Sequence, residues 1–368
     1  MAKELQRSVN ILYKEKFVDN LFKMIKDSKY EWDYYARDKG IKENLCKNWD
    51  CEKKHMSFIK KYLTVAGKNK AVSMFRVGKK LQNFERAIHT NSVYFLGCIF
   101  YEKLGMKDKI KFIRDNHDEF HFVWFLTSLV HDFMYFIEKN KKEYPEICSI
   151  ESFYAHFKIS NKLNKYSYEL LCNLSCNEKI LVNNIEKYFI FRLKEGKIDH
   201  GITAGIYLYN YLVKNREKMK GEGEVNNNLY WGKDLEKFYA IASYAIATHN
   251  MWRVKENDKD VKKYKENRLC DLILDGKGIK KLSIEKEPFS FLLALIDTLE
   301  PTKIYDCCKP KYVLENIDIQ FCEKEITIKN GEESKLDFEK LEKRAKEMES
   351  WLDLSVKLNN NEIIISVN

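Results

Sequence analysis

Histidine and aspartate residues occur on apolar segments at five places in this 368-residue chain. The segments have the pattern of buried helices, and a buried imidazole or carboxylate is unfavourable unless it has a partner. A divalent metal ion is the strongest partner available to such groups. The five places are His89, the pair His131–Asp132, His200, His249 and Asp297.

The spacing of these residues favours a site built from several helices. Their separations of 42, 68, 49 and 48 residues are far too long for a local zinc loop. They suit helices of a bundle that project side chains to a shared centre. Four imidazole nitrogens and two carboxylates suit divalent Mn, Fe, Ni, Zn or Mg. Each histidine alone is better explained as a hydrogen-bonded core residue, and each aspartate alone as a helix cap or salt-bridge partner. The complete set of six residues favours a metal site.

The order His…His-Asp…His…His…Asp resembles that of the HD superfamily of metal-dependent phosphohydrolases, over about residues 83–303. RAIHTNSV, around His89, is similar to the Arg-x-x-His-Ser/Thr-x-x-Val form of the family's first histidine. Asp-His-Gly at 199–201 is another form that the family uses. The resemblance implies an HD-type helical bundle that holds two divalent ions. The first would be held by His89, His131, Asp132 and Asp297, and the second by Asp132, which bridges, with His200 and His249.

The resemblance also implies a reaction. A hydroxide bridging the two ions would attack a phosphate ester of a nucleotide, cyclic nucleotide or nucleic acid, as in a phosphohydrolase or phosphodiesterase. Asp132, His200 and His249 would be the catalytic residues. The substrate phosphate needs cations, and two arginines share a helical face with an expected ligand. These are Arg86, three residues before His89, and Arg253, four residues after His249.

Two other functions stay open. The superfamily's diiron oxygenases, which resemble inositol oxygenase, use the same ligand order. A non-catalytic nucleotide-binding module for signalling would keep the fold without the reaction. The family often has Ile-Gly-Lys after its His-Asp pair, whereas this chain has Phe133-Met134-Tyr135, so the basic residue is missing. The complete ligand set favours the hydrolase over the binding module.

Composition indicates a mainly α protein. The chain has 22 Phe and 22 Tyr but only 14 Gly and 4 Pro, which favours long helices with few breaks. A net charge of +10 is compatible with a phosphorylated small molecule or nucleic acid as partner and diagnostic of neither. No apolar run reaches the length of a membrane span, and the N-terminus lacks a signal-peptide core. We therefore expect a cytoplasmic protein with no membrane partner.

The pattern divides the chain into three parts. Residues 1–82 read as a helical extension packed on the core, and residues 83–303 as the core itself. The core helices expected to carry ligands include Phe122–Tyr135, one that begins near His200, Lys233–Trp252, and one from Pro288 to Pro301. Residues 312–368 form a small α+β appendage, with strands at IDIQF, EITIK and NEIIISV and a helix over Phe338–Trp351. This appendage offers a surface for a protein partner or a second copy of the chain.

Overall fold

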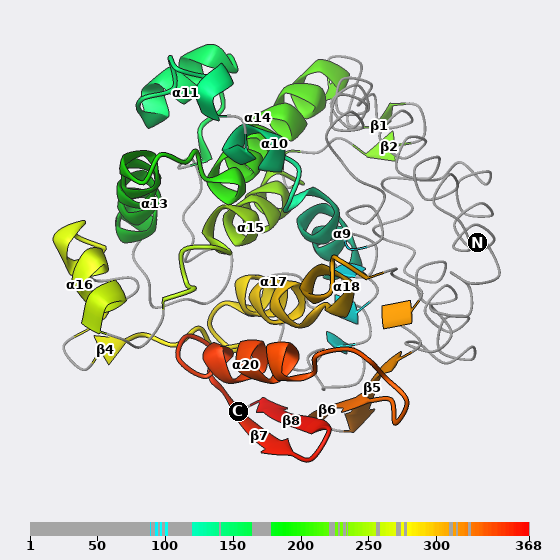
Figure 1. Cartoon of the computed structure of the whole chain (residues 1–368). Coiled ribbons are helices and arrows are strands. Elements are labelled where there is room, and N and C mark those ends of the chain that lie inside the picture. Colours follow the sequence, from blue (N-terminus) through cyan, green and yellow to red (C-terminus); the bar gives the residue numbers. More distant parts are fainter. Residues whose placement is uncertain are drawn as a thin grey trace.

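The computed structural model describes most of the chain from residue 89 onward (Figure 1). The described residues are 89, 93, 94, 96, 97, 100, 101, 120–139, 141–163, 178–220, 225, 226, 229, 230, 233, 235–254, 258–269, 274, 275, 278–308, 312, 313, 316–322 and 325–367. The expected N-terminal extension, residues 1–82, lies outside them, as does Arg86.

Four helices form the centre of the molecule (Figure 1). They are α9 (Phe120–Val130), α14 (His200–Lys220), α15 (Leu235–Thr248) and α17 (Pro288–Leu299). Helix α15 packs against each of the other three, and all of its residues except Lys237 are buried. Every residue of α17 is buried as well. A helix that is apolar on all sides belongs inside a bundle, so the expectation of a mainly α fold is confirmed.

Helices α14 and α15 approach each other closely because small residues line their contact. A Cβ atom on Gly205 would lie only 2.4 Å from the carbonyl oxygen of Ser243. One on Gly201 would lie 2.7 Å from the imidazole ring of His249. Neither position has room for a side chain. Four alanines of α15, Ala240, Ala242, Ala245 and Ala247, are also small enough to permit close packing, and all four are buried.

Shorter elements surround this centre. They are α10 (Tyr135–Lys139), α11 (Ile150–His156), α13 (Glu178–Lys194), α16 (Asp258–Glu266), α18 (Pro301–Ile304) and the hairpins β1 (Val225–Asn226) with β2 (Leu229–Tyr230) and β3 (Leu274–Asp275) with β4 (Gly278–Ile279). Two expectations are corrected here. The sequence GEGEVNNN at 221–228 predicts a surface loop but contains β1, and the polar stretch 258–286 predicts an irregular excursion but contains α16 and the second hairpin. Both stretches are rich in polar residues, so neither shows the apolar periodicity from which helices and strands are predicted.

The C-terminal residues form an α+β unit, as expected. Strands β5 (Ile317–Cys322), β6 (Glu325–Asn330), β7 (Leu354–Asn359) and β8 (Glu362–Val367) make one antiparallel sheet in the order β5-β6-β8-β7. Helix α20 (Glu339–Met348) lies between this sheet and α17 (Figure 1). Strand β7 was not anticipated, because its sequence LSVKLN buries only Leu354 and Val356 and so has a short alternation.

The C-terminal unit is joined to the helical centre by backbone contacts. The amide of Leu282 donates to the carbonyl of Trp351 at 2.9 Å, and the amide of Asp353 donates to the carbonyl of Leu282 at 2.8 Å. The hydroxyl of Tyr305 donates to the carbonyl of Asp337 at 3.0 Å. These bonds fix α20 against the centre. Among the described residues, none of the helices is long and apolar enough to cross a membrane.

Candidate metal centre

The pair His131–Asp132 lies in a turn, not on a helix. Helix α9 ends at Val130, and the chain turns through residues 131–134 before α10 begins at Tyr135. The amide of Phe133 bonds the carbonyl of Val130, and that of Tyr135 bonds the carbonyl of Asp132, each at 3.0 Å. Each of these bonds spans three residues instead of the four of an α-helix. The resulting turn directs both side chains of the pair inward, and both are buried. The expected helix over Phe122–Tyr135 is therefore interrupted at its functional residues.

Three of the other expected ligands, His200, His249 and Asp297, lie at or near helix ends. His200 is the first residue of α14, whose N-terminus is capped by Asp199 through its carboxylate and the amide of Ile202 at 2.9 Å. His249 follows the last residue of α15, which ends at Thr248, four residues before the expected end at Trp252. Asp297 lies two residues before the end of α17. Helix ends place polar groups without breaking the apolar packing of the helix bodies.

The six side chains converge. Nε2 of His89 lies 3.3 Å from Nε2 of His131 and 3.1 Å from Oδ1 of Asp297. Nε2 of His200 lies 3.3 Å from Oδ1 of Asp132. The ring of His249 is 5.1 Å from that of His200 and 5.8 Å from that of His131, centre to centre. All six residues are at least nine-tenths buried.

Two overlapping groups in this cluster have the geometry to hold a metal ion. His89, His131 and Asp132 form one group, and Asp132, His200 and His249 form the other; within each, the ligand atoms all lie within 4.8 Å of one another. Asp132 belongs to both. Its Oδ2 faces His89 at 3.8 Å, while its Oδ1 faces His200. The donor set of imidazoles and carboxylates fits a divalent ion.

Each of the four imidazole rings is held in place by a hydrogen bond at its Nδ1 atom. The Nδ1 of His131 lies 2.7 Å from the carbonyl of Ser128, and that of His249 lies 2.6 Å from the carbonyl of Ile246. A carbonyl oxygen can only accept, so Nδ1 carries the hydrogen and donates it. The Nδ1 atoms of His89 and His200 bond carboxylates in the same way. In each neutral ring the lone pair is then on Nε2, the atom that metal-ligating histidines commonly use.

Two glutamates that the sequence did not single out complete this arrangement. Oε2 of Glu300 accepts from Nδ1 of His89 at 2.8 Å and also caps α18 through the amide of Lys303 at 3.0 Å. Oε2 of Glu138 accepts from Nδ1 of His200. Glu138 is held in turn by Arg192 at 2.8 Å. Glu300 precedes a proline, an available signal for a helix cap, whereas no local pattern marked Glu138.

The protonation of the cluster reflects its concentrated negative charge. Burial works against a charged imidazole, but the carboxylates of Asp297 and Glu300 outweigh it and raise the pKa of His89 to about 9. For His200, burial is likewise outweighed by Asp132 and Glu138, which raise its pKa to about 9. Protons on these two rings therefore supply positive charge to the metal-free cluster at neutral pH.

The other members of the cluster shift the opposite way. Burial alone would raise the pKa of Asp132, but His131 and Lys303 hold it well below its usual value. Burial and the neighbouring His200 hold the pKa of His249 well below its usual value. The cluster therefore keeps its carboxylates ionised and His249 neutral, which are the protonation states that metal ligation requires.

Two cations contact Asp297. A guanidinium nitrogen of Arg253 bonds its Oδ2, and the ammonium of Lys303 bonds its Oδ1. Burial alone would raise the pKa of Asp297, but these two cations outweigh it and hold the pKa well below its usual value. Arg253 was expected to bind substrate, and the structure brings it to the edge of the cluster. Lys303 was not selected from the sequence, although it lies only six residues after Asp297, in α18.

The other four histidines, His55, His117, His121 and His156, lie in polar or unplaced stretches of the sequence, which predicts surface positions for them. His156 is exposed and pairs with Glu146 at 2.7 Å. The side chains of His55, His117 and His121 lie outside the described residues.

No protein-family model, curated protein or solved structure matches this chain. Its function therefore has to be argued from the cluster itself.

Proposed function

We propose that this chain is a metal-dependent phosphohydrolase or phosphodiesterase of the HD type, acting on a phosphate ester of a nucleotide, cyclic nucleotide or nucleic acid. The observation that carries the proposal is the convergence of four imidazoles, each tied at Nδ1, on two inward carboxylates with cations beside them. Two divalent ions in such a cluster lower the pKa of a water and neutralise charge on phosphoryl oxygens.

The chain's own residues have distinct tasks in this proposal. His89, His131, Asp132 and Asp297 would hold one ion, and Asp132, His200 and His249 would hold the other, since the two oxygens of Asp132 face His89 and His200. Buried helix ends fix these positions before substrate arrives, which removes a reorganisation cost from the reaction.

Arg253 and Lys303 bind the phosphate. Both reach Asp297 from outside the histidine cluster, and both are partly exposed. A guanidinium can take two phosphate oxygens at once, and a nearby ammonium adds a second cation to the same anion. Arg253→Ala is therefore expected to raise KM for a phosphate ester about tenfold while leaving metal content unchanged, since this residue is not a metal ligand.

The test is hydrolysis of a panel of phosphate mono- and diesters under argon, with the metal-free protein reconstituted with Mn²⁺. Turnover without oxygen that depends on the added ion supports the proposal. Turnover that consumes dioxygen, needs reduced iron and leaves phosphate esters intact would replace it with the oxygenase reading. Tight nucleotide binding with no turnover under either condition would favour the binding module.

A further inference from the structure

We propose that helix α20 of the C-terminal unit supplies a second anion subsite, which binds another phosphate group of the same substrate. The inference rests on the proposed function for the identity of that substrate, and it assigns a task to the C-terminal unit. The subsite is a cavity of about 460 Å³ between α20 and the α17–α18 segment.

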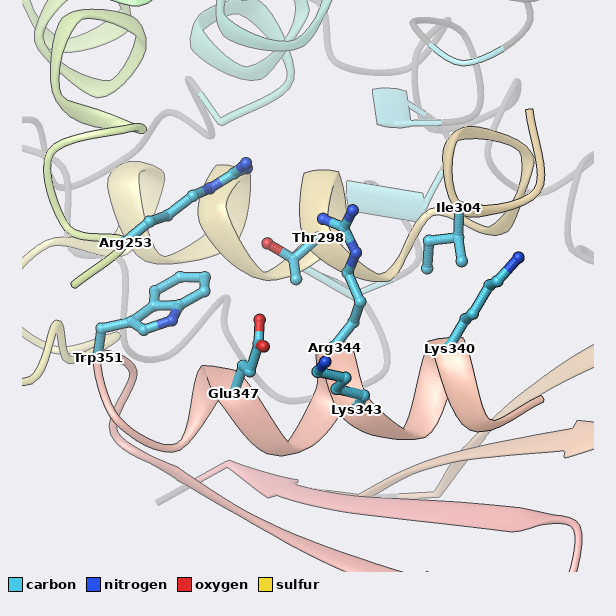
Figure 2. Close-up of a pocket in the computed structure, with 8 residues that line it drawn as sticks. All are labelled: Arg253, Thr298, Ile304, Lys340, Lys343, Arg344, Glu347 and Trp351. Atoms are coloured by element: carbon cyan, nitrogen blue, oxygen red, sulfur yellow. The ribbon is translucent and has the colours of Figure 1, made fainter. Parts of the chain in front are cut away.

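The two walls of this cavity come from different parts of the chain (Figure 2). Lys340, Lys343 and Arg344 project from α20, where they occupy successive turns of one face. The opposite wall carries Arg253 and Thr298, and the side chain of Arg344 rises toward Thr298 (Figure 2). The other face of α20, with Leu341, Ala345 and Met348, is buried.

Hydrogen-bond donors on the inner wall lack partners. Thr298 is 6% exposed, and its hydroxyl is buried with no hydrogen-bond partner among the described residues. The same holds for Nε of Arg253, although another nitrogen of its guanidinium bonds Asp297. A buried donor without a hydrogen-bond partner is unfavourable. A ligand that accepts hydrogen bonds would satisfy both groups.

The charge of the cavity selects an anion. Within the described part of the chain, neither Lys343 nor Arg344 forms an ion pair, and Lys340 only approaches Asp337 at 3.8 Å. Glu347 is the single carboxylate in the lining, against four cations. The cavity therefore combines lysine and arginine side chains with a hydroxyl and a guanidinium N–H, and these are groups that bind phosphate.

Arg253 links this cavity to the metal centre. It lines the cavity and also bonds Asp297, and Thr298 is the next residue of α17 after that ligand. A substrate phosphate beside Asp297 therefore lies next to the inner wall of the cavity. A second phosphate on the same molecule can reach the α20 cations, so the preferred substrate carries at least two phosphate groups, such as a nucleoside bisphosphate or an oligonucleotide.

The first arm of the test measures binding without catalysis. Inorganic pyrophosphate is titrated calorimetrically into the full-length, metal-free protein in the presence of chelator. The double variant Lys343→Ala/Arg344→Ala should weaken binding at least about tenfold, because two charge-assisted contacts are lost. The matched control Lys335→Ala/Lys357→Ala removes two exposed lysines of the same unit outside the cavity, and should bind like the wild type. All four positions are exposed, so thermal unfolding should be unaltered.

The second arm uses two substrates with one leaving group. Thymidine 5′-(p-nitrophenyl phosphate) has a single phosphate, and its 3′-phosphorylated form has two. The double variant should raise KM only for the second substrate, with kcat unchanged for both. Equal KM effects on the two esters, or pyrophosphate binding that the double variant does not weaken, would overturn the subsite. Hydrolysis of neither ester would refute the proposed function instead, and the calorimetric arm would still decide the subsite.

Discussion

At the scale of single residues, the candidate metal centre depends on what holds Nδ1 of each histidine. Ser128 and Ile246 do so with backbone carbonyls, which no substitution removes. Glu300 and Glu138 do so with side chains, so their contribution can be tested. Such outer partners fix the tautomer and the direction of a ligating ring.

Glu300→Gln and Glu138→Gln should each weaken metal binding about 10–100-fold. The amide keeps the shape of the side chain but removes the charge that raises the basicity of the imidazole. Glu300→Gln should affect the ion at His89, and Glu138→Gln the ion at His200. Titration with Mn²⁺, followed by its electron paramagnetic resonance signal, measures both sites.

The matched control is Glu146→Gln, which alters another glutamate–histidine pair, on the exposed His156. It should leave Mn²⁺ affinity unchanged. A loss of affinity as large as that of Glu300→Gln would mean that the effect arises from general charge rather than from the orientation of a ligand.

Metal binding should also release protons. The pKa values of His89 and His200 are raised to about 9, so both rings are protonated in the metal-free protein at pH 7.5. Ligation requires neutral nitrogen, so loading both sites at this pH should release about two protons per chain, and fewer as pH rises through 9. Calorimetry in buffers of different ionisation enthalpy measures this number. A binding enthalpy independent of the buffer would contradict the protonation described for the two rings.

At the scale of elements, the candidate ligands His200, His249 and Asp297 lie at or near helix ends, while the bodies of α14, α15 and α17 are buried in the centre. The sequence pattern located these helices because apolar residues surround each of them, and α14 and α17 begin at the expected His200 and Pro288. It did not locate the turn at residues 131–134, because the apolar periodicity continues through Phe133 and Met134. Tertiary packing, which bends the chain there, leaves no local signal.

Gly205→Ala tests the close contact of α14 with α15. The added methyl group would lie 2.4 Å from the carbonyl of Ser243, so a helix must shift. The free energy of unfolding should fall by about 1–3 kcal/mol, as for other overpacked sites. Denaturant unfolding measures the change. The control is Lys237→Ala, at the one residue of α15 that is not buried, and it should change the free energy of unfolding by less than about 0.5 kcal/mol. If Gly205→Ala leaves the free energy of unfolding unchanged, α14 and α15 do not approach each other as closely as described.

At the scale of the whole molecule, one centre gathers residues from positions 89 to 297, and the C-terminal unit closes one side of it through α20. The residue types and order of the six ligands were readable from the sequence, because each stands out against an apolar background. Glu138, Lys303 and the α20 cations were not, because charged residues of these types are frequent on any surface and only the fold brings them to the site. Arg86 and the extension of residues 1–82 remain predictions outside the described residues.

Metal content per chain tests the central claim most directly. Elemental analysis of protein loaded with divalent metal and then desalted should find about two ions per wild-type chain, one per His200→Ala chain and none per Asp132→Ala chain, because Asp132 belongs to both groups of ligands. Hydrolysis should be lost with Asp132→Ala. A wild-type protein that retains no stoichiometric metal, or an Asp132→Ala protein that retains two ions, would contradict the metal centre.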